Sequence, residues 1–477
     1  MTPAIAKELR ALLPMWSACI LVVGTAALAR DMGLLTAAVL TYGFGCVVLG
    51  AQSVGHEYGY GTLTTLLAQP IDRRRVWVIK MIVLAAMLAV LTALAIPTLF
   101  GIGVRVRAVR MSDITMLYLA AAAGLLLAPY LTMVCRSALG GVVFTVAIPG
   151  LLLVLGDLLG MYWYGLRRAG DIDRFKYALF WRAMFAVLAF GAIAGWRRFT
   201  RLEARDGHGA QIDLPRLFSR HARAAEPRRG RRQRAVWGLV AKELRLQQMT
   251  FVIVAIYVAF WLTAPGIQND AIFLYAMLLS ALIGALPSAE ERLFGTHEWQ
   301  ILQPVAGRRQ WAIKAGVAIG LALLLGAALP AVLNSVLGVG GQVRFRSEMW
   351  AQLVATIVVA TACALYVSSL STSGVRALAI SFPVIAGGVI LAKSTLTTIA
   401  WLSRHGWIPS LPGGLHLSHG ESLMALALVS VPLVALALHF AQRNHCSLER
   451  STRRVLTQGA WLLGYVVVAS AVLVGFG

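Results

Sequence analysis

Charged side chains are scarce in this 477-residue chain: Asp, Glu, Lys and Arg make up only 13% of it, against about a quarter in soluble domains. The acidic kind is the scarcer, with 20 Asp and Glu against 43 Lys and Arg and a formal net charge of +23. Hydrophobic residues reach 59%, and the mean hydropathy is +0.75. This composition excludes an ordinary soluble domain and predicts an integral membrane protein.

Other features are missing as well. The five cysteines are scattered and form no CxxC pair, so we expect neither a disulfide framework nor a metal site. The N-terminus lacks a hydrophobic stretch followed by a cleavage site, so we expect no signal peptide. No GxxxxGK[ST] motif occurs, and no long soluble segment could hold a nucleotide-binding domain. We therefore expect no enzyme activity and no cofactor on this chain. The basic charge comes without a nucleic-acid-binding motif, so we expect no nucleic-acid partner.

What the chain does contain is a repeat. The polar segment from Gly55 to Lys80 lies between two long apolar runs, and it recurs at 290–314 with a constant offset of 234 residues and no gap. The identical pairs are Glu57 and Glu291, Gly61-Thr62 and Gly295-Thr296, Gln69-Pro70 and Gln303-Pro304, Arg74-Arg75 and Arg308-Arg309, Trp77 and Trp311, Ile79 and Ile313, and Lys80 and Lys314. The protein is therefore interpreted as two copies of one unit.

Each copy also opens in the same way. The sequence AKELR at 6–10 returns at 241–245, which pairs Lys7-Glu8 with Lys242-Glu243. Apolar residues at helical spacing beside these charges predict a helix at 1–11 that lies along the membrane surface, and a second one at 237–246.

Apolar runs long enough to cross a bilayer number six in each half. They lie at about 12–29, 33–54, 76–104, 114–134, 138–162 and 177–196, and then at about 248–264, 271–288, 311–339, 349–370, 375–393 and 421–441. A run at about 459–476 has no partner and predicts an extra C-terminal span. The runs that contain Pro149 and Pro383 are candidates for re-entrant segments.

The predicted fold is thus an all-α polytopic membrane protein with 12–13 spans. Residues 1–200 form the first half, 201–235 a basic linker, 236–455 the second half and 456–477 the extra span. Six is an even number, so both halves share one topology and are related by an axis along the membrane normal. Basic residues, chiefly the twelve arginines at 197–235, favour a cytoplasmic N-terminus in the plasma (inner) membrane. We interpret the linker mainly as a solvated tether, with lipid or partner contact left open.

The repeated segment resembles a motif of the permease subunits of ATP-binding-cassette (ABC) transporters of the type-2 exporter family. The likeness lies in Glu57, Gly61-Thr62-Leu63, Pro70, Arg73 and Lys80. The second copy keeps Glu291, Gly295-Thr296, Pro304, Arg308 and Lys314 but has His297 in place of Leu. The fusion of both halves in one chain and the extra span depart from that family's pattern.

The resemblance implies a coupling helix in each half that docks on a separate ATPase subunit. Glu57 and Glu291 would contact that subunit, and Arg74 and Arg309 belong to the same blocks. The helices that carry Lys7-Glu8 and Lys242-Glu243 would transmit its motion. The resemblance also implies outward transport and two ATPase subunits that bind ATP and Mg. The substrate stays open among lipids, peptides, antibiotics, ions and glycans.

Other candidates are weaker. Intramembrane ionisable residues are suspects for function by default, and here they are Asp157, Arg182, Lys393 and His439. A histidine-rich loop holds His405, His416, His419 and Glu421, for which a polar loop is preferred to a metal site. Two other classes remain open. An ion-coupled secondary transporter would use carboxylates deep in the spans, and Asp157 is nearly the only such residue here. A membrane enzyme would use the histidine-rich loop.

Overall fold

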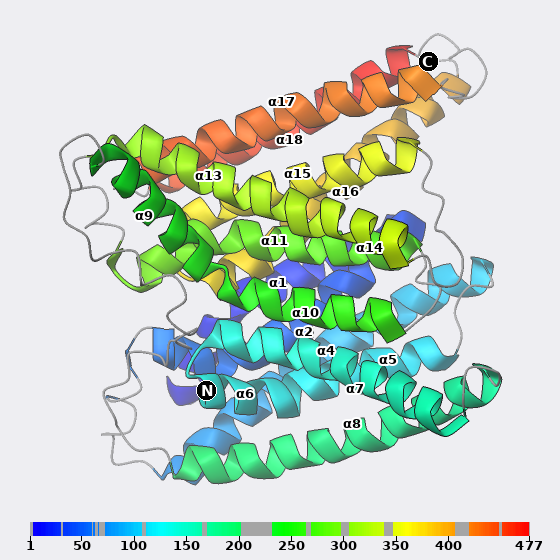
Figure 1. Cartoon of the computed structure of the whole chain (residues 1–477), viewed down its shortest axis with the longest axis vertical. Helices are drawn as coiled ribbons and strands as arrows, with labels where there is room; N and C mark the ends of the chain where they lie inside the picture. Colours follow the sequence, from blue (N-terminus) through cyan, green and yellow to red (C-terminus); the bar gives the residue numbers. More distant parts are fainter. Residues whose placement is uncertain are drawn as a thin grey trace.

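A computed structural model describes residues 3–29, 32–59, 61–62, 65, 72–106, 111–164, 169–201, 231–263, 269–296, 305–337, 347–405, 419–447 and 451–476. Throughout these residues every regular element is a helix, which confirms the predicted all-α class. The helices lie side by side along one common direction, and the two termini lie at opposite ends of that direction (Figure 1). Helical segments suit a bilayer because each satisfies its backbone hydrogen bonds within itself.

The first half holds six helical spans, and the fourth is interrupted by a π-helical turn at Ala123–Leu127. Its helices are α1 (Pro3–Ala29), α2 (Met32–Gly59), α4 (Arg73–Val106), α5 (Met111–Ala122), α6 (Ala128–Cys135), α7 (Ala138–Tyr164) and α8 (Ala169–Thr200).

The second half follows the same order, with a π-helical turn at Leu324–Ala328 in its third span. Its helices are α9 (Arg231–Leu246), α10 (Gln248–Thr263), α11 (Asn269–Leu293), α13 (Gly307–Leu323), α14 (Leu329–Leu337), α15 (Ser347–Leu370), α16 (Gly374–Arg404) and α17 (His419–His445). A last helix, α18 (Thr452–Phe476), has no counterpart among the described helices of the first half.

By length and composition, 12 of these helices can cross a membrane, or 13 if α9 and α10 together form one bent span. The protein is therefore a multi-pass membrane protein with the predicted number of spans. The predicted extra span corresponds to α18. The linker at 201–235 falls almost wholly outside the described residues.

Two local predictions are wrong. Residues 1–11 do not form a separate surface helix, because α1 continues without a break from Pro3 to Ala29. Only in the second half are the two parts distinct, where α9 meets α10 at 59°. The runs with Pro149 and Pro383 are not re-entrant: each proline lies inside one continuous helix, α7 or α16.

A hydrogen bond next to a proline accompanies the bend in the second half. Pro287 in α11 has no N–H, so it leaves the carbonyl of Ile283 without its helical partner. The side chain of Gln247, at the bend between α9 and α10, donates to that carbonyl at 2.9 Å. The first half has Ser53 where the second has Pro287, and α1 is continuous although Pro14 lies inside it.

Small residues let the helices of each half approach closely, as is common in membrane interiors. A Cβ added to Gly50 of α2 would lie 1.8 Å from the carbonyl oxygen of Gly124 in the π-helical turn. In the second half a Cβ on Gly284 of α11 would lie 2.6 Å from both the Thr361 oxygen and the Ala364 Cβ of α15. Each second span is therefore the tightly packed centre of its half.

The halves meet through equivalent helices, which pack on each other across the interface. The first span of each half packs on the fifth span of the other, α1 on α16 and α10 on α7, and α2 also packs on α16. Phe44 of α2 and Phe382 of α16 lie with ring centroids 4.5 Å apart. A small pocket beside Phe44 is lined only by apolar side chains from both halves, including Val146 of α7 and Leu278 of α11.

Candidate functional site: a buried charge cluster in each half

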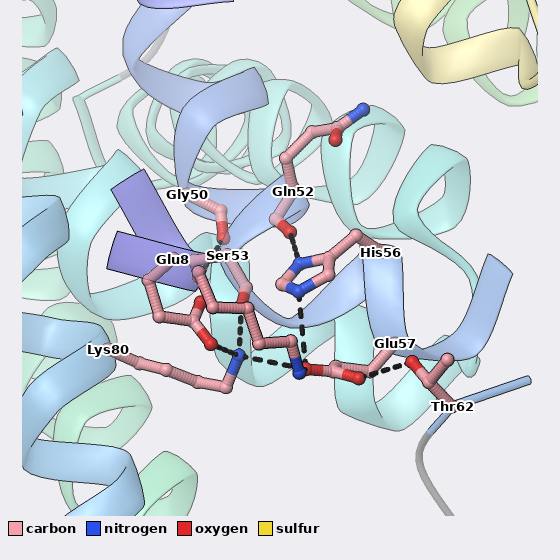
Figure 2. A network of polar contacts seen from close by, with 9 residues as sticks. Glu8, Gly50, Gln52, Ser53, His56, Glu57, Thr62 and Lys80 are labelled. Atoms are coloured by element: carbon pink, nitrogen blue, oxygen red, sulfur yellow. Dashed lines mark hydrogen bonds and ion pairs between the residues drawn. The ribbon is translucent and has the colours of Figure 1, made fainter. Parts of the chain in front are cut away.

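Four charged side chains from three helices meet in the first half (Figure 2). The ammonium of Lys80, in α4, lies 2.7 Å from Glu8 of α1 and 3.4 Å from Glu57 near the end of α2. A second ammonium, from Lys7 of α1, lies 2.8 Å from the same oxygen of Glu57. The cluster therefore binds the ends of the first three spans together.

Polar neighbours complete this first-half cluster. Lys80 also donates to the Ser53 carbonyl at 3.1 Å, and His56 Nε2 lies 3.2 Å from Glu57. The other ring nitrogen of His56 lies 2.8 Å from the carbonyl of Gln52, and the hydroxyl of Thr62 donates to Glu57. The Glu57 carboxylate is thus surrounded by donors from its own chain.

The second half builds the same cluster. Glu291 pairs with Lys242 and with Lys314, and Lys314 also lies 3.4 Å from Glu243. Lys314 donates to the carbonyl of Pro287 at 3.1 Å, the counterpart of the bond from Lys80 to Ser53. The four charged residues and Thr62 have the same residue type at their counterparts, whereas Gln52, Ser53 and His56 do not.

The position of His56 differs between the halves, since Glu290 replaces it in the second. The Glu290 carboxylate accepts a bond of 3.2 Å from the backbone N–H of Gly374, at the start of α16. A Cβ on Gly374 would lie 2.3 Å from that carboxylate oxygen. The end of α11, which also carries Glu291, is therefore hydrogen-bonded to the fifth span.

Both clusters are buried except at one edge. The side chains of Glu57, Lys80, Glu291 and Lys314 are at most 1% exposed, whereas Lys7 is 50% and Lys242 34% exposed. Removing one partner of a buried ion pair costs roughly 3–5 kcal/mol, because the other charge stays behind without compensation. A movement of one of the joined helices must therefore carry the others with it or break these pairs.

The repeated Gly-Thr explains how the second span ends beside the cluster. Gly61 and Gly295 have φ of +65° and +66°, a conformation open to glycine and strained for most other residues. In the first half Gly61 N–H bonds to the Tyr58 carbonyl and Thr62 N–H to the Glu57 carbonyl, the pattern of a Schellman cap. In the second half the Thr296 hydroxyl donates to the Glu291 carbonyl. The motif thus stops the helix one turn beyond its buried glutamate.

The remaining motif residues lie at the exposed start of the third span. Arg74, Arg308 and Arg309 are exposed and Arg73 is half-buried. Asp72 caps α4, since its side chain accepts from the Arg74 N–H at 3.0 Å. Pro70 and Pro304, and with them most of both predicted coupling helices, fall outside the described residues. In this structure Glu57 and Glu291 face inward, so their implied contact with an ATPase stays a prediction.

The sequence repeat identified these residues as candidates but did not indicate that they contact one another. Lys7-Glu8, Glu57 and Lys80 were predicted as a surface helix, a docking residue and the foot of a span, with no expectation that they touch. The signal was present: charges are rare in this chain, and these four recur at matched places in both copies. Buried charges require partners, so matched charges of both signs at the same ends of neighbouring spans predict pairing.

One metal geometry occurs among the described residues. Glu8, His56 and Glu57 each offer a ligand atom within 4.8 Å of the others. The ammonium groups of Lys7 and Lys80 already occupy these carboxylates, and two fixed positive charges oppose a metal cation at that point. The site fits an ion-pair cluster better than a metal centre.

The other suspected residues do not join the clusters. Asp157 of α7 pairs with Lys176 of α8 at 3.1 Å, and Lys176 also pairs with Asp173 at 3.1 Å. Arg182 and His439 are exposed on their helices, and His405 is exposed at the end of α16, where its ring bonds to the Trp401 carbonyl. His416 and the side chains of Lys393, His419 and Glu421 fall outside the described residues.

Comparison with known proteins names no relative: no family model, no curated protein and no solved structure matches the chain. The case for a function therefore depends on the repeat, the span arrangement and the two clusters.

Proposed function

We propose that this chain is the membrane-spanning permease of an ATP-driven exporter and that it docks separate ATPase subunits at both repeated segments. The observation that carries the proposal is the duplicated charge cluster. Each cluster lies where the second span ends, directly before the segment that resembles a coupling helix, and it joins that end to the first and third spans.

This arrangement suits the transmission of a push. A force on the segment after Gly61 acts on the end of α2, and the pairs of Glu57 with Lys7 and Lys80 pass it to α1 and α4. The corresponding pairs of Glu291 do the same in the second half. Because the first span of each half packs on the fifth span of the other, a simultaneous push at both segments would rearrange the interface between halves.

In the proposed cycle, ATP and Mg bind to two partner subunits, and their closure drives both segments together. The cavity between the halves then changes from inward-open to outward-open, and a difference in cargo affinity between the two states gives the direction of transport. The N-terminus and both repeated segments would lie on the cytoplasmic side of the plasma (inner) membrane, where the motors have access to ATP.

The ion-coupled alternative depended on Asp157. The pairing of its carboxylate with Lys176 gives it a structural role between α7 and α8. The apolar lining around Phe44 offers no carboxylate to bind an ion at the interface of the halves. Ion coupling is therefore the second candidate, and Asp157 is the residue at which it can be tested.

The experiment is affinity purification of the tagged chain from membranes of its native host in mild detergent. We expect a subunit with a GxxxxGK[ST] motif to co-purify, and we expect it to be lost from the double variant Arg74→Glu with Arg308→Glu. Both arginines are exposed, so their reversal should spare the fold. The matched control reverses Arg443 and Arg453, which are exposed at the same membrane face. Transport by a chain that purifies without any ATPase would refute the proposal.

A further inference from the structure

Three helix ends meet at corresponding places in the two halves, at the membrane face that carries the N-terminus. They are the ends of α2, α6 and α8 in the first half and of α11, α15 and α17 in the second. Phe199 packs on Trp77 with ring centroids 4.9 Å apart, and His445 packs on Trp311 at 5.6 Å. The two tryptophans are equivalent in the repeat, so Phe199 corresponds to His445. The residues directly before them, Arg198 and Asn444, therefore correspond as well.

The second half fills this place with its own side chains. Arg292 of α11 donates to the carbonyl of Ser369 and, at 3.5 Å, to the carbonyl of Asn444. The Asn444 side chain exchanges two hydrogen bonds, of 2.9 and 3.0 Å, with Gln458 of α18. The extra helix thus completes a closed polar network at the ends of α15 and α17.

The first half leaves the same place incomplete. Tyr58 stands at the position of Arg292, and its hydroxyl is buried without a hydrogen-bond partner in the structure. Tyr58 packs against the buried cluster that contains Met133 of α6 and Phe199 of α8, so Arg136 and Arg198 follow or adjoin its neighbours in the chain. Among the described residues, no carboxylate forms an ion pair with either arginine. A buried hydroxyl without a partner and two arginines without an ion pair, Arg136 half-buried and Arg198 exposed, therefore lie at the same group of helix ends.

The backbone at Arg136 is also unusual. This residue has a φ of +49°, the only positive value on a non-glycine residue in the described part of the chain. The left-handed conformation costs an ordinary residue about 1–2 kcal/mol. It occurs at the tight turn from α6 to α7, where Arg136 is half-buried.

We propose that Tyr58, Arg136 and Arg198 bind a phosphate group, supplied by an anionic lipid headgroup or by soluble phosphate. Two guanidinium groups and a hydroxyl donor provide the charge-assisted hydrogen bonds that phosphate oxygens accept. In the first half the phosphate occupies the position that corresponds to the hydrogen-bonded network of Arg292, Asn444 and Gln458 in the second half. Among the described helices of the first half none corresponds to α18, so none supplies an equivalent of Gln458 at this place.

The test uses the full chain in neutral detergent, titrated with phosphatidylglycerol and with phosphatidylcholine as the reference, and counts bound lipid by native mass spectrometry. We expect preferential retention of phosphatidylglycerol, weakened about tenfold or more in Arg136→Gln with Arg198→Gln, since two charge-assisted contacts are lost. Tyr58→Phe keeps the packing and should weaken retention a few-fold. The matched control, Arg443→Gln with Arg453→Gln, should bind like the parent chain.

Inorganic phosphate then separates the two sources. Displacement of the lipid by millimolar phosphate assigns the site to soluble phosphate, whereas retention of the lipid assigns it to a headgroup whose acyl chains add affinity. Either result upholds a phosphate site. The proposal is overturned if the Arg136 and Arg198 double variant and Tyr58→Phe, both eluting as folded protein, retain phosphatidylglycerol as well as the control does.

Discussion

Replacing Lys80 with methionine should destabilise the protein far more than an ordinary substitution. Among the described residues Glu8 pairs with no other cation, and one of its oxygens already has no partner. The variant would leave the Glu8 carboxylate buried without compensation, while Glu57 would keep Lys7. Breaking a buried pair in this way costs roughly 3–5 kcal/mol, so we expect a loss of that size in the free energy of unfolding.

A double variant tests whether the loss comes from the stranded charge. In Lys80→Met with Glu8→Met the whole pair is replaced by apolar side chains, which is often neutral or stabilising for a buried pair. We therefore expect the double variant to recover most of the stability. Unfolding by steric trapping in lipid bicelles would measure all three free energies. A cost below about 1 kcal/mol for the single variant, or an additive cost for the double, would refute the buried-cluster account.

Three smaller predictions concern single positions. Gly61→Ala should lower stability by about 1–2 kcal/mol, because its φ is positive, and Gly61→Asn should cost less; thermal denaturation would rank them. Gly50→Leu should prevent accumulation of folded protein in membranes, because no Cβ fits there, whereas Gly43→Ala, with nothing within 4 Å, should accumulate normally. Asp157→Asn should lower thermal stability yet leave ATP-driven transport of the cargo intact; loss of transport without loss of stability would instead favour ion coupling.

Much of the fold could be predicted from the sequence, because runs of about 20 apolar residues in a chain with few charges have few alternatives to crossing a bilayer. The repeat likewise follows from a constant offset between Glu57 and Glu291. The straight course of α1 could not be predicted from the repeated AKELR alone. The Pro14 inside α1 would even favour a break there, yet the helix is continuous, and the bend occurs in the half that has no proline at that place.

The contents of the site were harder to predict for a similar reason. Glu8 and Lys80 are 72 residues apart, and only the packing of α1 on α4 brings them within 2.7 Å. The sequence predicted Glu8 on a surface helix and Lys80 at the start of a span, where charged side chains commonly extend to the interface. The structure instead places cations and carboxylates in matched numbers, so that they can be buried together.

The most direct test of the central claim is site-specific photo-crosslinking at the two repeated segments. Thr65 and Phe294 are exposed residues within them, and Phe294 can be replaced by the similar p-benzoylphenylalanine. Exposed Thr452, at the start of α18, serves as the control position. In native membranes we expect adducts from both segments, but not from the control, with a subunit that carries a GxxxxGK[ST] motif. Adducts only with lipid or with the chain itself would contradict the proposal that an ATPase docks there.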